Sequence, residues 1–431
     1  MISLELTFLL FCIFLVSLIV NRNIIFPSNI LILSFLVAAI CNTIIMNVLN
    51  SDITNETMWI IVIFVSLFLI FSWVSSIIVK SDLFNNYIPN KSYSKNKKIY
   101  HLDLKYWKII FLLCIQLLAL IIFAYEFHKY IGSFTSDNLS VYRGYSLSEK
   151  SPFPSWVSML SNVSVMISYV SIYVFINNIF SKKKDKKRNF ILFLSSVASL
   201  PLPIMSSSRF TDVSIILFSL VLYIHFEYYH NGKLGKSFFI TSFILVLVFY
   251  VFQYLGTIIG RGQYNQLSFV YYYGGGISLF DNYIRNPFIL NSNAPGYQTF
   301  ANVYNLLKKI GVLDFSYNRS YPYGYVNGIG IGNVYSCLLS YFYDFGYEGV
   351  MIMSSIFGAI FGYMFEKVKS IKLSGIKVSV ICYFYITYTL VFSPYSENIV
   401  WNLLSVGLYE NLLLIFLIAR FLDYKVQNRG E

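Results

Sequence analysis

The residues best suited to chemistry are arginines that stand outside the long apolar runs of the chain. Loops that we assign below to the external side of a membrane hold four lysines but five arginines: Arg143, Arg209, Arg261, Arg285 and Arg319. A guanidinium group donates paired hydrogen bonds that match phosphate oxygens, and it stays charged when partly desolvated. Glycines flank Arg261 and let a ligand approach the backbone. The pattern indicates a phosphate-bearing ligand; the alternative is that Arg209 and Arg261 reach lipid headgroups.

Tyrosine is the second residue type that suggests chemistry. The segment 260–347 holds 15 of the 37 tyrosines, including the groups Tyr271 to Tyr273 and Tyr321 to Tyr325. A tyrosine ring has an apolar face and a polar tip, so it can stack on a sugar ring while its hydroxyl group forms a hydrogen bond. We therefore expect these tyrosines, Tyr272, Tyr323 and Tyr325 among them, to line a glycan groove. The alternative is an aromatic belt at the membrane interface.

Carboxylates on the same side could supply a general base for a hydroxyl nucleophile. The best candidate is Asp344, either as that base or as an acid that orients an arginine; the others are Asp281, Asp314, Glu348 and Glu397. The external loops contain no Asp-x-Asp pair, the segment 260–347 contains no histidine, and the five cysteines lack metal-ligand spacing. We therefore expect no metal and no other cofactor.

The elements that must position these residues are membrane helices. The chain has 431 residues, of which 57% are hydrophobic and only 12% are charged, and its mean hydropathy is +0.62. Apolar runs of roughly 20 residues, long enough to cross a bilayer, recur along the chain. They predict an all-α transmembrane bundle of about eleven spans: 3–20, 29–48, 58–79, 107–127, 156–180, 190–205, 211–229, 237–259, 348–366, 374–392 and 400–422. Pro201 and Pro203 predict a break in the sixth span.

The distribution of basic residues sets the expected orientation. The net charge is +12, but most lysines collect in alternate loops, which is typical of cytoplasmic loops and not of a nucleic-acid-binding protein. The run Lys182 to Arg188 is interpreted as a topology anchor. We therefore expect the N-terminus outside and the C-terminus inside.

The predicted spans divide the chain into three parts. Residues 1–259 contain the first eight helices and a Lys-rich cytoplasmic loop at about 80–106. Residues 260–347 form one large external loop that binds substrate. Residues 348–431 contain the last three helices and a cytoplasmic tail. A loop of that length without a function is unusual in a compact protein.

Several motifs in the second half of the chain resemble those of the Wzy-type O-antigen polymerases, which assemble oligosaccharide repeat units on bacterial surfaces. The motifs are Asn333-Val334-Tyr335, Ser340 to Gly349 with Asp344-Phe345-Gly346, Tyr321 to Tyr325, Pro295 to Phe300, Gly260-Arg261-Gly262 and Ser208-Arg209. The spacings from Arg285 to Gly296 and from Arg319 to Gly330 echo an Arg-x10-Gly pattern of such loops. The resemblance covers about 200–366 in motif and the whole chain in hydropathy.

The resemblance implies an integral glycosyltransferase of a bacterial plasma (inner) membrane. Donor and acceptor would both be polyprenyl-pyrophosphate-linked oligosaccharides, and the product would be a surface polysaccharide such as O-antigen or capsule. Arg209, Arg261 and Asp344 would be catalytic, and Arg143, Arg285, Arg319, Tyr272, Tyr323, Tyr325, Asn333 and Tyr335 would bind substrate. Partners would be membrane lipid, a flippase and a chain-length regulator, and no nucleic acid.

Three alternatives stay open at this stage. An O-antigen ligase has similar chemistry, but the external histidine expected of that family is missing from the large loop. A lipid-linked oligosaccharide flippase should carry charged residues inside its spans, which are almost free of charge here. A purely structural membrane protein would not need a segment rich in arginine and tyrosine.

Overall fold

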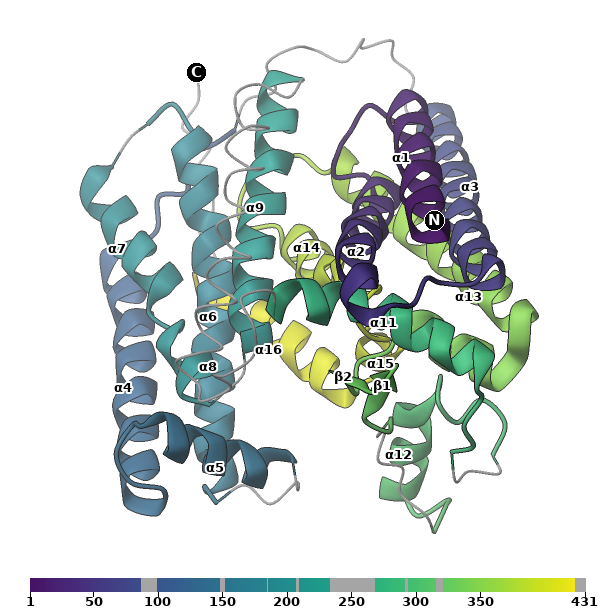
Figure 1. Ribbon diagram of the computed structural model, residues 1–431. Helices are drawn as coiled ribbons and strands as arrows, with labels where there is room; N and C mark the ends of the chain where they lie inside the picture. Colours follow the sequence, from purple (N-terminus) through teal and green to yellow (C-terminus); the bar gives the residue numbers. More distant parts are fainter. Residues whose placement is uncertain are drawn as a thin grey trace. The chain divides into compact units, whose positions relative to one another are not determined.

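The computed structural model describes residues 1–86, 99–147, 152–183, 185–206, 209–232, 268–290, 294–314 and 321–422 (Figure 1). Almost all regular structure in these residues is helical, and the strands form a single short hairpin. In chain order the elements up to the predicted eighth span are α1 (Ile2–Val20), α2 (Pro27–Leu49), α3 (Asn55–Asn86), α4 (Tyr106–Tyr130), α5 (Ser136–Leu147), α6 (Ser155–Phe180), α7 (Lys186–Val197), α8 (Pro201–Met205) and α9 (Arg209–Asn231). The later elements are α11 (Ser268–Arg285), α12 (Ala301–Lys309), β1 (Gly324–Val326), β2 (Ile329–Gly332), α13 (Cys337–Ser370), α14 (Val378–Val391), α15 (Ile399–Leu403) and α16 (Val406–Leu422).

Eight described helices are long and apolar enough to cross a membrane, so the chain is a multi-pass helical membrane protein. They correspond to the first seven predicted spans and to the ninth. The tenth predicted span contains a shorter apolar helix, α14. The last is divided into α15 and α16, and the eighth, 237–259, lies outside the described residues. The predicted break in the sixth span is confirmed, because α7 ends at Val197 and α8 begins at Pro201.

The chain forms two compact units. The first comprises Met1–Asn90, Gln266–Ser370 and Thr387–Tyr409, and the second comprises Lys91–Asn265, Ile371–Ile386 and Glu410–Glu431. In the second unit, Gln116 of α4 joins neighbouring helices: its Nε2 donates to the carbonyl oxygen of Ser195 (2.9 Å) and to Oγ of Ser168 (3.0 Å). Hydrogen bonds between helices are one means of holding a membrane bundle together.

A regular contact between α3 and α13 forms the frame of the first unit. Gly358 and Gly362 of α13 face the backbone of α3 so closely that an added Cβ would stand 2.6 Å from the carbonyl oxygen of Phe68 and 2.3 Å from that of Ser72. One turn earlier, Ser354 donates to the carbonyl oxygen of Phe64. Small residues at every fourth position let two membrane helices approach closely. Ser354, Gly358 and Gly362 therefore let α13 pack directly against the backbone of α3.

A second close contact joins α11 to α2, which lie across each other in Figure 1. An added Cβ on Gly274 would stand 2.6 Å from the backbone nitrogen of Asn42. Asn42 is buried there and donates from Nδ2 to Oγ of Ser278 at 2.6 Å. The segment that begins the predicted external loop is therefore a packed helix, in which Gly274 to Gly276 serve close approach.

The hairpin β1–β2 follows from a turn signal in the sequence. Asn327 and Gly328 connect the strands with positive φ angles of 49° and 78°, which is the conformation that Asn-Gly favours in two-residue hairpin turns. The strands are antiparallel, with Tyr325 opposite Gly330. The turn places Asn327 against the end of α2, where its Nδ2 donates to the carbonyl oxygens of Leu49 (2.8 Å) and Asn50 (3.0 Å).

Candidate functional site

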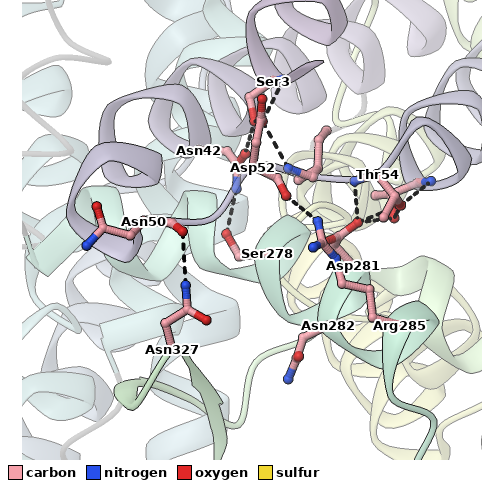
Figure 2. A network of polar contacts seen from close by, with 12 residues as sticks. Ser3, Asn42, Asn50, Asp52, Thr54, Ser278, Asp281, Asn282, Arg285 and Asn327 are labelled. Carbon is pink, nitrogen blue, oxygen red and sulfur yellow. Dashed lines mark hydrogen bonds and ion pairs between the residues drawn. The ribbon is translucent and has the colours of Figure 1, made fainter. Parts of the chain in front are cut away.

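A polar pocket of about 190 Å³ lies in the first unit. The loop between α2 and α3, the last turns of α11 and the tip of the hairpin contribute its lining, which includes Asp52, Asp281, Asn282, Arg285, Asn286 and Asn327. Figure 2 shows Asp52, Asp281, Asn282, Arg285 and Asn327 of these three segments near one another, with Arg285 between Asp52 and Asp281. Residues from distant parts of the sequence therefore form one site.

Arg285 is held in a fixed orientation in this pocket. It follows Asp281 by one helical turn, and its Nε donates to Oδ2 of Asp281 at 2.8 Å. One Nη donates to the backbone carbonyl oxygen of Asp52. A guanidinium group has five N–H donors, so three remain for a ligand, and the side chain is 41% exposed.

Asp281 is the anchor of this arrangement. Its side chain is only 5% exposed. Its Oδ1 accepts hydrogen bonds from the backbone N–H of Thr54, the hydroxyl of Thr54 and the hydroxyl of Thr57, each at 2.7 Å. The carboxylate therefore ties α11 to the start of α3 and orients Arg285 at the same time (Figure 2).

Asp52 organises the loop on the opposite wall. Its carboxylate accepts from the amino group of Met1, the backbone N–H of Ile2 (2.7 Å), and the backbone N–H (3.0 Å) and hydroxyl (2.5 Å) of Ser3. Burial by itself raises the pKa of this carboxyl group, but the hydrogen bonds from these groups outweigh burial and hold the pKa well below its usual range. Asp52 is thus ionised throughout the neutral range and fixes the loop whose carbonyl oxygen binds Arg285.

The hairpin closes the pocket and carries the exposed tyrosines. Asn282 of α11 donates from Nδ2 to the carbonyl oxygen of Tyr325 at 3.1 Å. The rings of Tyr323 and Tyr325 lie 5.2 Å apart and are 51% and 58% exposed. An added Cβ on Gly330 would stand 2.9 Å from the Tyr323 ring and 3.4 Å from the Tyr325 ring. The two rings therefore cover the opposite strand and offer an aromatic surface beside the pocket segments.

Asp344 lies elsewhere, in the first part of α13. It accepts hydrogen bonds from the backbone N–H groups of Gln298 (3.2 Å) and Thr299 (2.6 Å). Two residues later, Gly346 interrupts the helix with φ 61°. The described donors to Asp344 thus belong to the 298–299 loop and include the side chain of Thr299, and the acid that orients Arg285 is Asp281.

The other predicted site residues are dispersed. Arg143 is half-buried in α5 and Arg209 begins α9, both in the second unit, and the side chains of Arg209 and Tyr272 lie outside what the structure describes. Arg261 and Arg319 also lie outside the described residues. Asn333 is exposed after β2, whereas Tyr335 is 3% exposed and donates from its hydroxyl to the carbonyl oxygen of Pro322 at 3.2 Å. Among the described residues that the sequence offered for the site, Arg285 and the candidate acid Asp281 line the pocket.

Three of the motifs that carry the family resemblance meet on the first part of α13. Asp344 binds the 295–300 loop, as described above, and the hydroxyl of Tyr321 lies 2.6 Å from that of Ser340. Tyr335 in turn packs against Tyr321, with ring centroids 5.3 Å apart. These motifs therefore support one another structurally, next to the segments of the pocket and not inside it.

Sequence reasoning named Asp281 among the candidate acids without pairing it with Arg285, and it missed Asp52 and the amides around Arg285. The spacing of Asp281 and Arg285 was a usable signal, because residues four apart on a helix face each other. The Asn327-Gly328 turn was another. Asp52 carried no signal, because its contact with Arg285 joins segments that are distant in the sequence.

No family model, no curated protein and no solved structure matches this chain. Within the described ranges, no group of three or more His, Cys, Asp or Glu residues lies close enough together to hold a metal ion. The family resemblance therefore rests on the sequence motifs.

Proposed function

We propose that this chain polymerises polyprenyl-pyrophosphate-linked oligosaccharide repeat units into a surface polysaccharide on the outer face of a bacterial plasma membrane. The observation that carries the proposal is the preorganised guanidinium group of Arg285 in a polar pocket, within a multi-pass membrane protein. The exposed pair Tyr323 and Tyr325 on the adjoining hairpin adds the aromatic surface that a glycan needs. The motif resemblance supplies the reaction.

The proposed reaction is a glycosyl transfer between two lipid-linked glycans. A hydroxyl oxygen of the acceptor repeat unit attacks the anomeric carbon of the donor glycan and gives its proton to a general base, for which Asp344 is the candidate. The bond between that carbon and the polyprenyl pyrophosphate breaks, and the pyrophosphate leaves with the electron pair. Fixed cationic donors stabilise the charge that develops on such a leaving group. We assign this role to Arg209 and Arg261, with Arg143 and Arg319 in substrate binding.

Two acids take separate roles within this proposal. Asp344 was the candidate for a base or for an acid that orients an arginine. Asp281 now takes the orienting role, because it binds Arg285 directly and is itself fixed by Thr54 and Thr57. Asp344 stays the candidate base, and it also holds the 298–299 loop on α13. The reaction is proposed to need no metal, and a flippase and a chain-length regulator are the proposed partners.

The first test is deletion of the gene in its own host, with the lipid-linked surface glycan resolved on a gel. Collapse of long ladders to a single capped repeat unit supports the polymerase. Intact ladders that stay on the lipid carrier would indicate a ligase instead, and loss of all outward-facing glycan would indicate a flippase.

Complementation with Arg285→Lys then tests the pocket. Lysine keeps the positive charge but loses the fork that binds Asp281 and the Asp52 carbonyl together, so we expect shorter glycan chains at a normal protein level. Arg420→Lys is the matched control, because Arg420 lies in the last turn of α16 and does not line the pocket. Full-length chains with Arg285→Lys would contradict a role for the fork.

A further inference from the structure

We infer that the pocket beside Arg285 binds one uncharged sugar ring of the glycan and does not bind the pyrophosphate group. The inference rests on the proposed function, since it names the part of the lipid-linked substrate that this pocket takes. Three properties of the described lining carry it: charge, hydrogen-bonding capacity and size.

The charges of the lining disfavour a phosphate ligand. Two carboxylates, those of Asp52 and Asp281, accompany the single guanidinium group of Arg285 among the residues that line the pocket. The amino group of Met1 pairs with Asp52 and at most balances the second carboxylate. A pyrophosphate group would add further negative charge close to these carboxylates, where like charges repel. An uncharged ligand meets no such repulsion.

The hydrogen-bonding groups of the pocket are mixed. Arg285 keeps three N–H donors after its bonds to Asp281 and Asp52. Asn282 and Asn327 use Nδ2 to donate to backbone carbonyl oxygens, so their Oδ1 atoms remain as acceptors. Asn286 also lines the pocket, and an amide side chain can both donate and accept. A phosphate group offers only acceptors, whereas a sugar hydroxyl donates and accepts, so the lining matches a polyol.

The size of the pocket selects a single ring. Its volume of about 190 Å³ is below the range of roughly 300–1,000 Å³ that is usual for drug-sized ligands. The walls are also fixed before a ligand arrives, because Asp52 and Asp281 are engaged by internal donors on both sides. The pocket therefore suits one sugar ring, with the rest of the glycan outside it.

The test uses the full chain in lipid nanodiscs and ligand-observed NMR, which detects weak binding. The probes are glucose, galactose, N-acetylglucosamine, glucuronic acid and inorganic pyrophosphate, each added alone. Asn286→Ala is the test variant, because Asn286 is exposed and lines the pocket. Asn47→Ala is the matched control, because Asn47 is exposed on α2 and does not line the pocket.

We expect at least one neutral sugar to bind, and to bind more tightly than glucuronic acid. Asn286→Ala should weaken that binding on the order of tenfold, the effect of one or two lost hydrogen bonds, and Asn47→Ala should leave it unchanged. Three results would each overturn the inference: no binding of any neutral sugar, tighter binding of glucuronic acid, or pyrophosphate binding that Asn286→Ala weakens.

The result of the sugar-binding test can be interpreted separately from the result of the gene deletion. Sugar binding that depends on Asn286, together with intact glycan ladders after gene deletion, would refute the polymerase and leave the pocket assignment standing. Collapsed ladders together with no sugar binding would refute the pocket assignment alone.

Discussion

Two helix pairs in the first unit use the same device for different purposes. In the α3–α13 pair, Ser354, Gly358 and Gly362 bring two membrane helices together along a ridge of small residues. In the α2–α11 pair, Gly274 brings α11 equally close to α2, but polar residues follow it on the next turns: Ser278, Asp281 and Arg285. The first contact builds a frame, and the second positions a site.

The effect of a close glycine contact depends on which side chains it brings together. Along α3 and α13 the groups brought together are mainly apolar, so the gain is packing. Along α2 and α11 the close approach lets the buried amide of Asn42 reach Ser278 and brings Asp281 to Thr54 and Thr57. Changes in the first pair should therefore act on folding, and changes in the second pair should act on the pocket.

The largest expected effect is that of Gly362→Leu in the frame. A leucine there must displace the Ser72 backbone of α3, which is 2.3 Å from an added Cβ, at a cost of about 3 kcal/mol or more. We expect little folded protein, measured as monodisperse yield and thermal melting in detergent. Gly407→Leu is the control, because nothing lies within 4 Å of an added Cβ at that position. Equal yields from the two variants would contradict a role of the α3–α13 contact in folding.

Gly274→Ala should have a smaller effect on folding and a large one on the pocket. The methyl group would meet the backbone of Cys41 and Asn42 at 2.7 and 2.6 Å, so α11 must shift, at about 2 kcal/mol. We expect folded protein with a reduced melting temperature and short glycan ladders on complementation. Gly144→Ala is the control, with nothing within 4 Å of the new methyl group. Normal ladders with Gly274→Ala would show that the pocket tolerates a displaced α11.

Asp281→Asn tests the orientation of Arg285 while leaving the glycine contact between α11 and α2 unchanged. The amide keeps the shape of the side chain but removes the charge that binds Arg285, and we expect a loss of about 1–2 kcal/mol in unfolding free energy. Glycan ladders should shorten more than this loss explains, because Arg285 is no longer oriented. Asp137→Asn, at an exposed position of α5, provides the control for ladder length and for thermal melting. Wild-type ladders with Asp281→Asn would contradict the orienting role of Asp281.

Acidification should give the smallest effect, through Asp52. Because folding lowers the pKa of Asp52, the stabilisation that it supplies is present above the ordinary carboxyl pKa of about 4. It is lost as pH falls from there through the lower pKa of the folded state. We expect Asp52→Asn to reduce unfolding free energy by about 1 kcal/mol at pH 7, and this difference should shrink below about pH 4. A difference in melting temperature that stays constant from pH 7 to pH 3 would contradict this account.

Much of the fold follows from local sequence, and the departures have physical reasons. Apolar length predicts α1 to α4, α6, α7 and α9 but not the polar helix α5, and Pro201 predicts the break before α8. The predicted ninth span begins at 348, just after the kink at Gly346 that divides α13. The part of α13 before the kink, from Cys337, is not predicted because Tyr341, Tyr343 and Asp344 lower its hydropathy. The helix α11 was read as loop because Gly274 to Gly276 normally disfavour a helix; here they pack against other backbone segments.

The class of the protein follows from the sequence alone, because a run of about 20 apolar residues can satisfy its backbone in hydrocarbon only as a helix. The sequence also pointed to Arg285 and to the tyrosines of the hairpin by their residue types. Only the tertiary structure decided that Asp281 and the Asp52 carbonyl hold Arg285, and that Asn282, Asn286 and Asn327 surround it. The reason is that these contacts depend on how closely α11 approaches α2 and α3, and that distance is set by side-chain packing between segments far apart in the chain.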